Sequence, residues 1–273
     1  MTATDLTEPI EPSEPIQLIL RFDSNKPRKL KYNLAAAHKA GATTLLTFGG
    51  AYSNHIRAVA AAGRAEGFKT IGVIRGEEHL PLNDSLAFAV SQGMHLLYMD
   101  RESYRTKNSA GTRRFLESVF GDFFLIPEGG SNPKAVKGCA ELPGEIEEPF
   151  DVICCPVGTG GTLAGIAAGL GPDRRAIGFA TLKGGFLTRE VEKLQRQTYG
   201  KVFDNWHIED DFHFGGYAKV PRELDDFAAR FGAGHGFDVD RVYVAKMLYG
   251  ITAMTEAGRF APGTRVVAVI TTG

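Results

Sequence analysis

Lys26 is the residue of this chain whose type and position best suit covalent chemistry. It stands beside Arg28 and Lys29, and Pro27 follows it directly. Neighbouring cations lower the pKa of a lysine and raise the fraction of neutral amine that can attack a carbonyl group. Although a single lysine is usually a solvated surface cation, this setting predicts that Lys26 is a nucleophile that forms a Schiff base.

One turn of the chain carries glycines and threonines in the order Gly158-Thr159-Gly160-Gly161-Thr162. Glycines let backbone N–H groups approach an anion, a following helix adds its positive end, and threonine hydroxyls add donors. The turn lacks the Gly-Lys-Ser/Thr ending of a P-loop and the third glycine of a dinucleotide-binding turn. These residues alone favour a phosphate site and a plain tight turn about equally.

A second turn places polar side chains at the start of an expected helix. Ser53, Asn54 and His55 follow the pair Gly49-Gly50 closely. Serine and asparagine are favoured helix N-caps, but capping needs only one of them and no pair of glycines. A loop that cradles a carboxylate would use both features. A single histidine is more often structural, so we predict no role for His55.

Alternating strands and helices must position these residues, which predicts an α/β fold with parallel sheets. The strand expected at 151–157 is hydrophobic without alternation, as in a sheet covered on both faces. The three glycine turns, 49–54, 127–132 and 158–162, each follow an expected strand directly. Because ligands bind at the carboxyl ends of such strands, we expect the turns to converge on one cleft.

Several boundaries follow from local signals. Pro27 suits the first position of a helix that ends at Gly41, which would leave Lys26 just outside the helix. The segments 103–120 and 133–146 are expected to be mostly helical, and 202–220 irregular.

The composition of the 273-residue chain excludes several classes of protein. Its formal net charge of −1 gives no basic surface for nucleic acid, and no apolar run approaches the roughly 20 residues of a membrane span. The acidic residues 1–14 lack the features of a signal peptide, which predicts a cytoplasmic protein. Cys139, Cys154 and Cys155 have no metal-site spacing, so we expect buried thiols and no metal.

Taken together, the motifs resemble the 1-aminocyclopropane-1-carboxylate (ACC) deaminase/D-cysteine desulfhydrase family. Its members use pyridoxal 5'-phosphate (PLP) and have the tryptophan synthase β-like fold of type II PLP enzymes. The resemblance runs in order from about Asn25 to the C-terminus. It rests on Asn25-Lys26-x-Arg28-Lys29-Leu30, Gly49-Gly50-x-x-Ser53-Asn54-His55, Pro127-Glu128-Gly129-Gly130-Ser131, Gly158-Thr159-Gly160-Gly161-Thr162 and the closing Thr272-Gly273.

The resemblance implies a role for each matching residue. Lys26 would carry PLP as a Schiff base, and Lys29 would lie close to the phosphate. Ser53 would contact the substrate carboxylate or attack a cyclopropane ring, and Asn54 would meet the ring oxygen of the cofactor. The other implied residues are the phosphate cup Gly158, Thr159, Gly160, Gly161 and Thr162, the active-site tyrosines Tyr217 and Tyr243, and Thr272, which would face the pyridine nitrogen.

The resemblance also implies two interleaved, open, doubly wound parallel-sheet domains. A smaller domain of residues 39–127 would be inserted into a larger PLP-binding domain of residues 1–38 and 128–273. PLP would lie between them, with Lys26 on the larger domain and Ser53 on the smaller. A homodimer is a further expectation from the family.

The implied activity is PLP-dependent deamination of a small amino acid. The first candidate is D-cysteine desulfhydrase-like β-elimination to pyruvate, ammonia and sulfide, and the second is ACC deaminase-like ring opening. ACC deaminases carry Glu and Leu where this chain has Val244 and Thr272; Thr272 favours the desulfhydrase, whereas Val244 fits neither. The segment before Lys26 is several residues shorter than in the family, and Ser24 replaces a glycine. A serine dehydratase-like or cysteine synthase-like enzyme and a non-catalytic PLP-binding protein therefore remain as alternatives.

Overall fold

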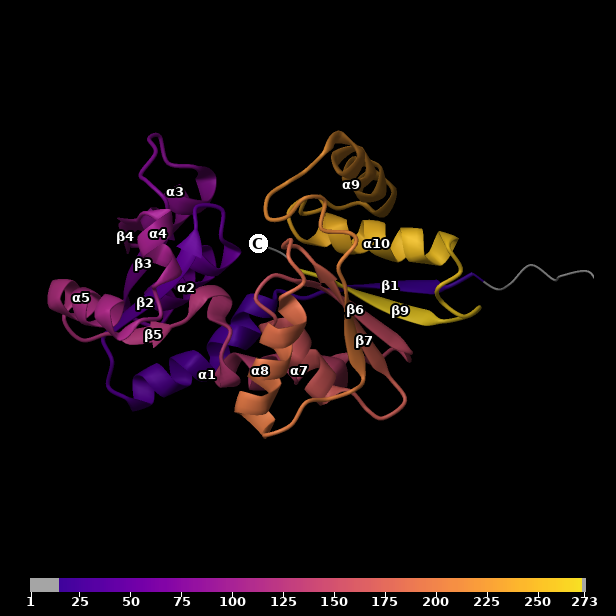
Figure 1. Cartoon of the computed structure of the whole chain (residues 1–273), viewed down its shortest axis with the longest axis horizontal. Helices are drawn as coiled ribbons and strands as arrows, with labels where there is room; N and C mark the ends of the chain where they lie inside the picture. The colour runs from indigo at the N-terminus through magenta and orange to yellow at the C-terminus, as the bar shows by residue number, and fades with distance from the viewer. Residues whose placement is uncertain (1–14, 272–273) are drawn as a thin grey trace, which may run out of the picture.

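Two parallel β-sheets form the framework of the molecule in the computed structural model, which describes residues 15–271 (Figure 1). One sheet has five strands in the order β1-β9-β6-β7-β8, and the other has four in the order β4-β3-β2-β5. Every strand pairing in these sheets is parallel. The predicted α/β fold with two parallel sheets is therefore confirmed.

The five-stranded sheet joins the two ends of the described chain, because β1 pairs along its whole length with β9. Helices α7 and α8 cover one face of this sheet, and α9 and α10 cover the other (Figure 1). The predicted buried thiols, Cys139, Cys154 and Cys155, are all buried and free. The elements are β1 (Gln17–Phe22), β6 (Val152–Val157), α7 (Gly161–Gly169), β7 (Arg175–Ala180), α8 (Leu187–Tyr199), β8 (Trp206–Glu209), α9 (Arg222–His235), α10 (Val244–Glu256) and β9 (Arg265–Ile270).

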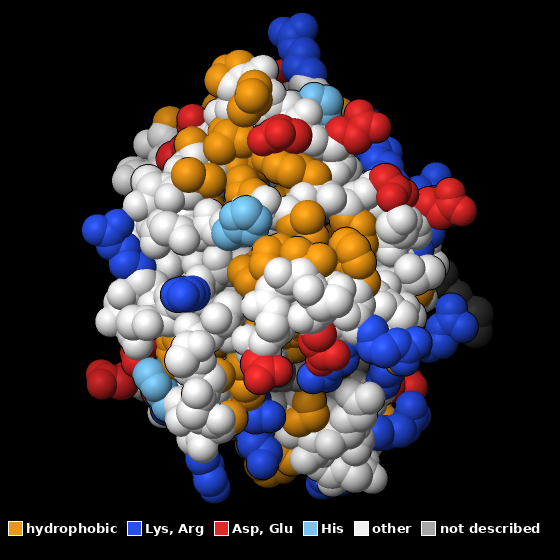
Figure 2. Space-filling view, turned by 90° about the vertical axis from the view of Figure 1, so that its left-hand side faces the viewer, with side chains coloured by type: hydrophobic (Ala, Val, Ile, Leu, Met, Phe, Trp, Pro, Cys, Tyr) orange, Lys and Arg blue, Asp and Glu red, His pale blue; other side chains and the backbone are white. Residues whose placement is uncertain are grey.

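The four-stranded sheet is built entirely from residues 44–126 and lies on the left in Figure 1. Side chains of α2 and α3 pack on one face, and side chains of α4 and α5 pack on the other. Phe115 and Val119 of α5 stay exposed, and hydrophobic side chains gather on this end of the molecule (Figure 2). The elements are β2 (Thr44–Gly50), α2 (Asn54–Ala65), β3 (Lys69–Arg75), α3 (Asp84–Ser91), β4 (Met94–Met99), α4 (Arg101–Arg105), α5 (Ala110–Phe120) and β5 (Phe124–Ile126).

Helix α1 (Asn25–Lys39) runs between the two sheets and packs on α6 (Pro133–Cys139). The two helices touch at Gly138, where an added Cβ would lie 2.0 Å from the carbonyl oxygen of Arg28. Only a glycine permits this approach of two backbones. No helix within residues 15–271 is long and apolar enough to span a bilayer.

The predicted start of the first helix was wrong. Helix α1 begins at Asn25, so Lys26 lies in its first turn rather than outside it. The first four N–H groups of a helix have no intrahelical acceptor, and Pro27 at the third position therefore loses no hydrogen bond.

Three other segments differ from the sequence-based expectation. The segment 202–220 contains the edge strand β8, and 103–120 forms two helices because Ser109 caps a new one at Ala110. The segment 133–146 also divides: α6 ends at Cys139, and a 3₁₀ turn (Leu142–Glu145) follows. Pro143 lies in that turn and lacks the N–H that an α-helix would need there.

Candidate active site

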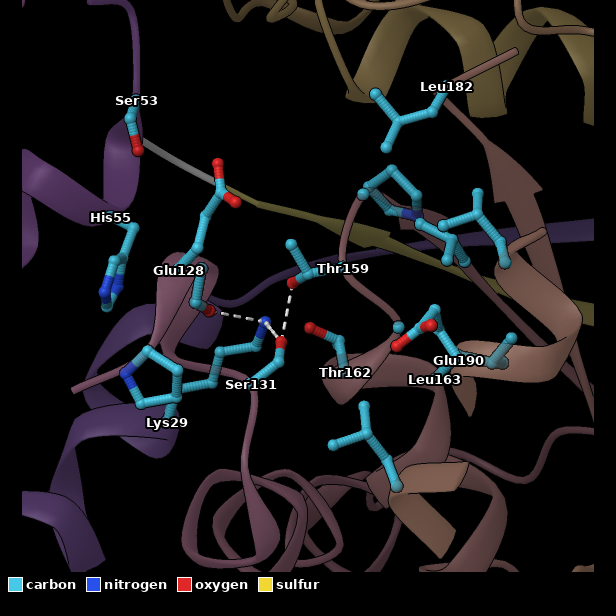
Figure 3. Close-up of a pocket in the computed structure, with 18 of the residues that line it drawn as sticks. Lys29, Ser53, His55, Glu128, Ser131, Thr159, Thr162, Leu163, Leu182 and Glu190 are labelled. Carbon is cyan, nitrogen blue, oxygen red and sulfur yellow. Dashed lines mark hydrogen bonds between the residues drawn. The ribbon is translucent and has the colours of Figure 1, made fainter. Parts of the chain in front are cut away.

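A pocket of about 590 Å³ lies between the two sheets, where their strands end. All three glycine turns line it, as the sequence predicts: Ser53 and Asn54 come from the first, Gly129 from the second, and Gly158 and Thr159 from the third. Figure 3 shows Ser53 and His55 across the pocket from Thr162. The pocket therefore brings together segments that are far apart in the sequence.

The pocket gathers nearly all of the residues that the resemblance singled out. Gly161 is not part of the wall, because it is buried against Ser131, which an added Cβ would approach to 2.7 Å. Thr272 lies outside the described residues, although its neighbour Thr271 lines the pocket. The predicted residues in the wall are Lys26, Lys29, Ser53, Asn54, Gly158, Thr159, Gly160, Thr162, Tyr217 and Tyr243.

Lys26 presents an amine that is half neutral near pH 7. Burial is the largest cause and the nearby charge of Lys29 the second, and together they lower the pKa of Lys26 to about 7. Its Nζ donates a 2.6 Å hydrogen bond to Asn25, whose amide donates to Thr162 Oγ1 at 2.8 Å. The amine is therefore both held in place and available as a nucleophile.

Arg28 does not lower the pKa of Lys26, contrary to the sequence-based expectation. Its guanidinium pairs with Asp23 at 2.7 Å and with Glu145 at 2.6 Å. These two carboxylates neutralise it, so only Lys29 acts on the pKa of Lys26 among the cations nearby in sequence. Arg28 instead anchors the short connection between β1 and α1 through Asp23.

Lys29 is a buried amine whose hydrogen-bond partners in residues 15–271 carry no formal charge. Its Nζ donates to the carbonyl of Gly129 at 3.0 Å and to Ser131 Oγ at 3.4 Å, and Ser131 contacts Thr159 Oγ1 at 2.6 Å (Figure 3). Burial lowers the pKa of Lys29. A buried cation without a counter-ion is costly, so this place fits an anion.

The start of α7 is arranged to receive that anion. Gly160 stands at its N-cap in the left-handed conformation, with φ +82°, and no described side chain caps the helix. Its first N–H groups are therefore left for a ligand, beside the hydroxyls of Thr159 and Thr162. The arrangement fits a phosphate group.

Helix α2 starts differently on the opposite wall. Ser53 Oγ accepts a hydrogen bond from the N–H of Ile56 at 3.4 Å, so the capping interpretation holds, and Ser53 and Asn54 line the pocket as well. His55 is buried and contacts Thr47 Oγ1 at 2.8 Å. Burial, followed by the charges of Lys29 and Lys26, lowers the pKa of His55 to about 3, so it is neutral.

Tyr217 and Tyr243 meet edge to face at the pocket wall, with ring centroids 6.1 Å apart. Burial raises the pKa of both phenols, so both are protonated at neutral pH. A Cβ added at Gly50 would lie 3.9 Å from the Tyr217 hydroxyl, and a Cβ added at Gly158 would lie 3.4 Å from the Tyr243 ring. The two phenols thus approach two different glycine turns.

The structure adds residues that the sequence reasoning missed. Arg75 and Lys107 also line the pocket, and Lys107 pairs at 3.2 Å with Glu128 of the second predicted turn. Arg75 is the last residue of β3, and the rule that ligands bind where parallel strands end would have found it. Lys107 follows the short helix α4 and has no motif that distinguishes it.

Lys246 of α10 is a further residue that the sequence reasoning missed. It is completely buried, and its Nζ donates to the carbonyls of Gly216 at 2.6 Å and Thr181 at 3.4 Å. Burial lowers its pKa to about 8. It fixes the loop that carries Tyr217, in which Phe214 and Ala218 adopt positive φ.

Known proteins are similar to this chain in both sequence and structure. A family model described as "Pyridoxal-phosphate dependent enzyme" matches residues 19–272. A putative ACC deaminase of Pyrococcus furiosus is 30% identical, over 93% of this chain and 81% of the relative. A bifunctional D-cysteine desulfhydrase/ACC deaminase of Arabidopsis thaliana is 27% identical, over 93% of this chain and 69% of the relative. A crystal structure of an ACC deaminase homologue aligns with TM-score 0.79 and 27% identity, over 91% of this chain and 79% of the other.

Proposed function

Because the chain belongs to the pyridoxal-phosphate dependent enzyme family, we propose that it is a PLP-dependent lyase or deaminase of a small amino acid. The first candidate is D-cysteine desulfhydrase-like β-elimination to pyruvate, ammonia and sulfide, and the second is ACC deaminase-like ring opening. The observation that carries the proposal is the Lys26 amine, with its pKa of about 7, in one pocket with an uncapped glycine–threonine helix start.

The residues present fit PLP. The first N–H groups of α7 and the hydroxyls of Thr159 and Thr162 would hold the phosphate, and Lys29 would supply the opposite charge. Lys26 would hold the aldehyde carbon, with Asn54 near the ring oxygen. When bound, PLP supplies an electron sink for the negative charge that develops at the substrate Cα.

Lys26 then has a second task, as the base that takes the Cα proton. A base works best when its pKa lies near the working pH, and the pKa of about 7 places the Lys26 amine there. The hydrogen bond to Asn25, fixed in turn by Thr162, holds Nζ in the pocket while it is free of the cofactor.

The start of α2 would bind the substrate. The N–H groups of Asn54 and His55 precede the first intrahelical bonds, and the Ser53 hydroxyl lies beside them. Together they form a site for the α-carboxylate. Tyr217 and Tyr243, which are protonated at neutral pH, would give a proton to the leaving group.

We propose the domain division 1–38 with 128–273 and 39–127 on the same basis. The strands of the four-stranded sheet all fall within 44–126, which supports it. A cytoplasmic location and a homodimer are proposed from the sequence and the family. Thr272 keeps its proposed place beside the pyridine nitrogen.

Borohydride trapping tests the proposal. Purified protein should show the visible absorbance of lysine-bound PLP, and reduction followed by peptide mass spectrometry should place the cofactor on Lys26. Lys26→Ala should lose the absorbance and at least about 1,000-fold of the turnover. Lys31→Ala is the matched control, because Lys31 lies on the same helix but pairs with Glu141 at the surface.

Release of a 2-oxo acid distinguishes the candidate reactions: pyruvate from D-cysteine, L-cysteine, D-serine or L-serine, and 2-oxobutanoate from ACC. Turnover of D-cysteine supports the desulfhydrase, and turnover of ACC supports the deaminase. Turnover of L-serine alone would identify a dehydratase-like enzyme. Bound PLP without a 2-oxo acid product from any of them would identify a non-catalytic protein, and a protein that takes up no PLP would contradict the whole proposal.

A further inference from the structure

Arg75 directs a positive charge at the pocket from the end of β3. An added Cβ at Gly50 would lie 3.7 Å from Nη2 of Arg75 and 3.9 Å from the hydroxyl of Tyr217. The guanidinium and the phenol therefore border the same part of the pocket, and Gly50 leaves that part open. All three residues line the pocket wall.

Two aromatic rings position the guanidinium of Arg75. Its central carbon lies 6.0 Å from the ring centroid of Tyr104 and 5.9 Å from that of Tyr217. Such cation–π contacts orient an arginine without using its five N–H donors for a carboxylate. The two rings flank the guanidinium, and its charge stays available.

The charge of Arg75 is not neutralised by the described chain. Glu128 is the acid on this side of the pocket, but it accepts from the Tyr104 hydroxyl at 3.0 Å and pairs with Lys107 at 3.2 Å. Within residues 15–271, no carboxylate forms an ion pair with Arg75, whereas Arg28, Arg241, Arg259 and Arg265 each have one. An unpaired arginine fork in a pocket matches a planar carboxylate from outside.

We propose that Arg75 binds a second carboxylate, at the side-chain end of the substrate. This inference rests on the proposed function, in which the start of α2 takes the α-carboxylate through Asn54 and His55. The proposal extends the substrates of β-elimination to amino acids that carry an acidic group beyond Cβ.

A matched pair of probes tests this charge preference. S-Carboxymethylcysteine and S-carbamoylmethylcysteine differ only in the charge of the distal group, and each is tried as both enantiomers. The Cβ–S bond breaks, the sulfur leaves as the thiol, and water converts the remaining three carbons and nitrogen to pyruvate and ammonia. We expect kcat/KM to be about 10-fold to 100-fold higher for the acidic probe.

Arg75→Met should remove this preference by slowing the acidic probe about 10-fold to 100-fold more than the neutral probe, which makes no charged contact with the guanidinium. Arg57→Met is the matched control, because Arg57 stacks on Phe88 at 4.3 Å outside the pocket. Equal losses on both probes would overturn the inference, because Arg75 would then serve the α-carboxylate or the fold. A wild-type protein that turns over both probes equally well would also overturn the inference.

Calorimetry keeps this result separate from the proposed function. Binding of glutamate is compared with binding of glutamine, in both enantiomers, to the wild type and to Arg75→Met. Tighter binding of glutamate that disappears in the variant supports the carboxylate site even if the protein turns over no amino acid. Equal binding of the two, or a preference that survives in Arg75→Met, overturns it, whereas absence of PLP overturns only the proposed function.

Discussion

The two walls of the pocket are built differently. The lysine wall (Lys26, Lys29 and the turn 158–162) consists largely of buried groups that bond to one another: Lys29 is 4% exposed and Thr162 is 5% exposed. The serine wall (Gly50, Ser53, Asn54 and Arg75) is more open, with Ser53 half-buried and Arg75 exposed.

This difference matches two kinds of ligand. A buried, uncompensated amine and an uncapped helix start gain most from an anion that remains bound, because each release would leave the charge desolvated. Exposed donors lose less when their ligand leaves, because water replaces it. The lysine wall therefore suits a resident cofactor and the serine wall a substrate that exchanges.

After the loss of Lys26 itself, Lys29→Met gives the largest expected effect on the lysine wall. Methionine fills a similar volume but cannot pair with a phosphate, so PLP should bind about 10-fold to 100-fold more weakly. Because burial disfavours the charged form of Lys29, its replacement should cost the unbound protein little stability. Fluorescence titration with PLP and thermal unfolding of the apoprotein measure the two quantities.

The same variant has a pH signature. Lys29 lowers the pKa of Lys26, so its removal should move that pKa upward from about 7. The rate of PLP uptake by the apoprotein needs the neutral amine. It should therefore rise with pH with its midpoint near pH 7 in the wild type, and with its midpoint at higher pH in Lys29→Met. Lys31→Met should leave the profile unchanged, and an unchanged profile in both variants would contradict the coupling.

Gly160→Ala should affect the same wall somewhat less. The added Cβ would lie 2.9 Å from Cγ2 of Val191, and φ is +82°, a conformation that costs a non-glycine residue about 1–2 kcal/mol. PLP affinity should fall by about 10-fold as the turn shifts. Gly171→Ala is the control, because its added Cβ would meet nothing within 4 Å. Equal PLP affinity in the two variants would argue that the turn does not hold the phosphate.

Much of the lysine wall could be predicted because its signals are local. The run 152–157 reads as a buried strand, and glycines directly after it predict a ligand turn at its carboxyl end. Five motifs in order then identified the family, and the matches to the pyridoxal-phosphate dependent enzymes and to ACC deaminases confirm it.

The serine wall was predicted only in part because its charge depends on tertiary contacts. The rule on strand ends could have placed Arg75 at the pocket, but only the folded chain shows that Glu128 pairs with Lys107 and not with Arg75. Lys246 was missed for a similar reason, since a lysine in a helix is usually solvated, whereas this one lies against the carbonyl of Gly216. The edge strand β8 has four residues, too few for a clear alternation.

Ser53→Ala gives the smallest expected effect and tests whether the serine wall binds substrate. Loss of the cap, whose hydrogen bond is long at 3.4 Å, should cost about 0.5–1 kcal/mol of unfolding free energy. If Ser53 also contacts the α-carboxylate, KM should rise by about 10-fold while PLP affinity stays unchanged. Ser109→Ala removes the cap of α5 outside the pocket and should reproduce only the loss of stability. An unchanged KM in Ser53→Ala would mean that Ser53 only caps α2, and that the N–H groups of Asn54 and His55 bind the carboxylate without it.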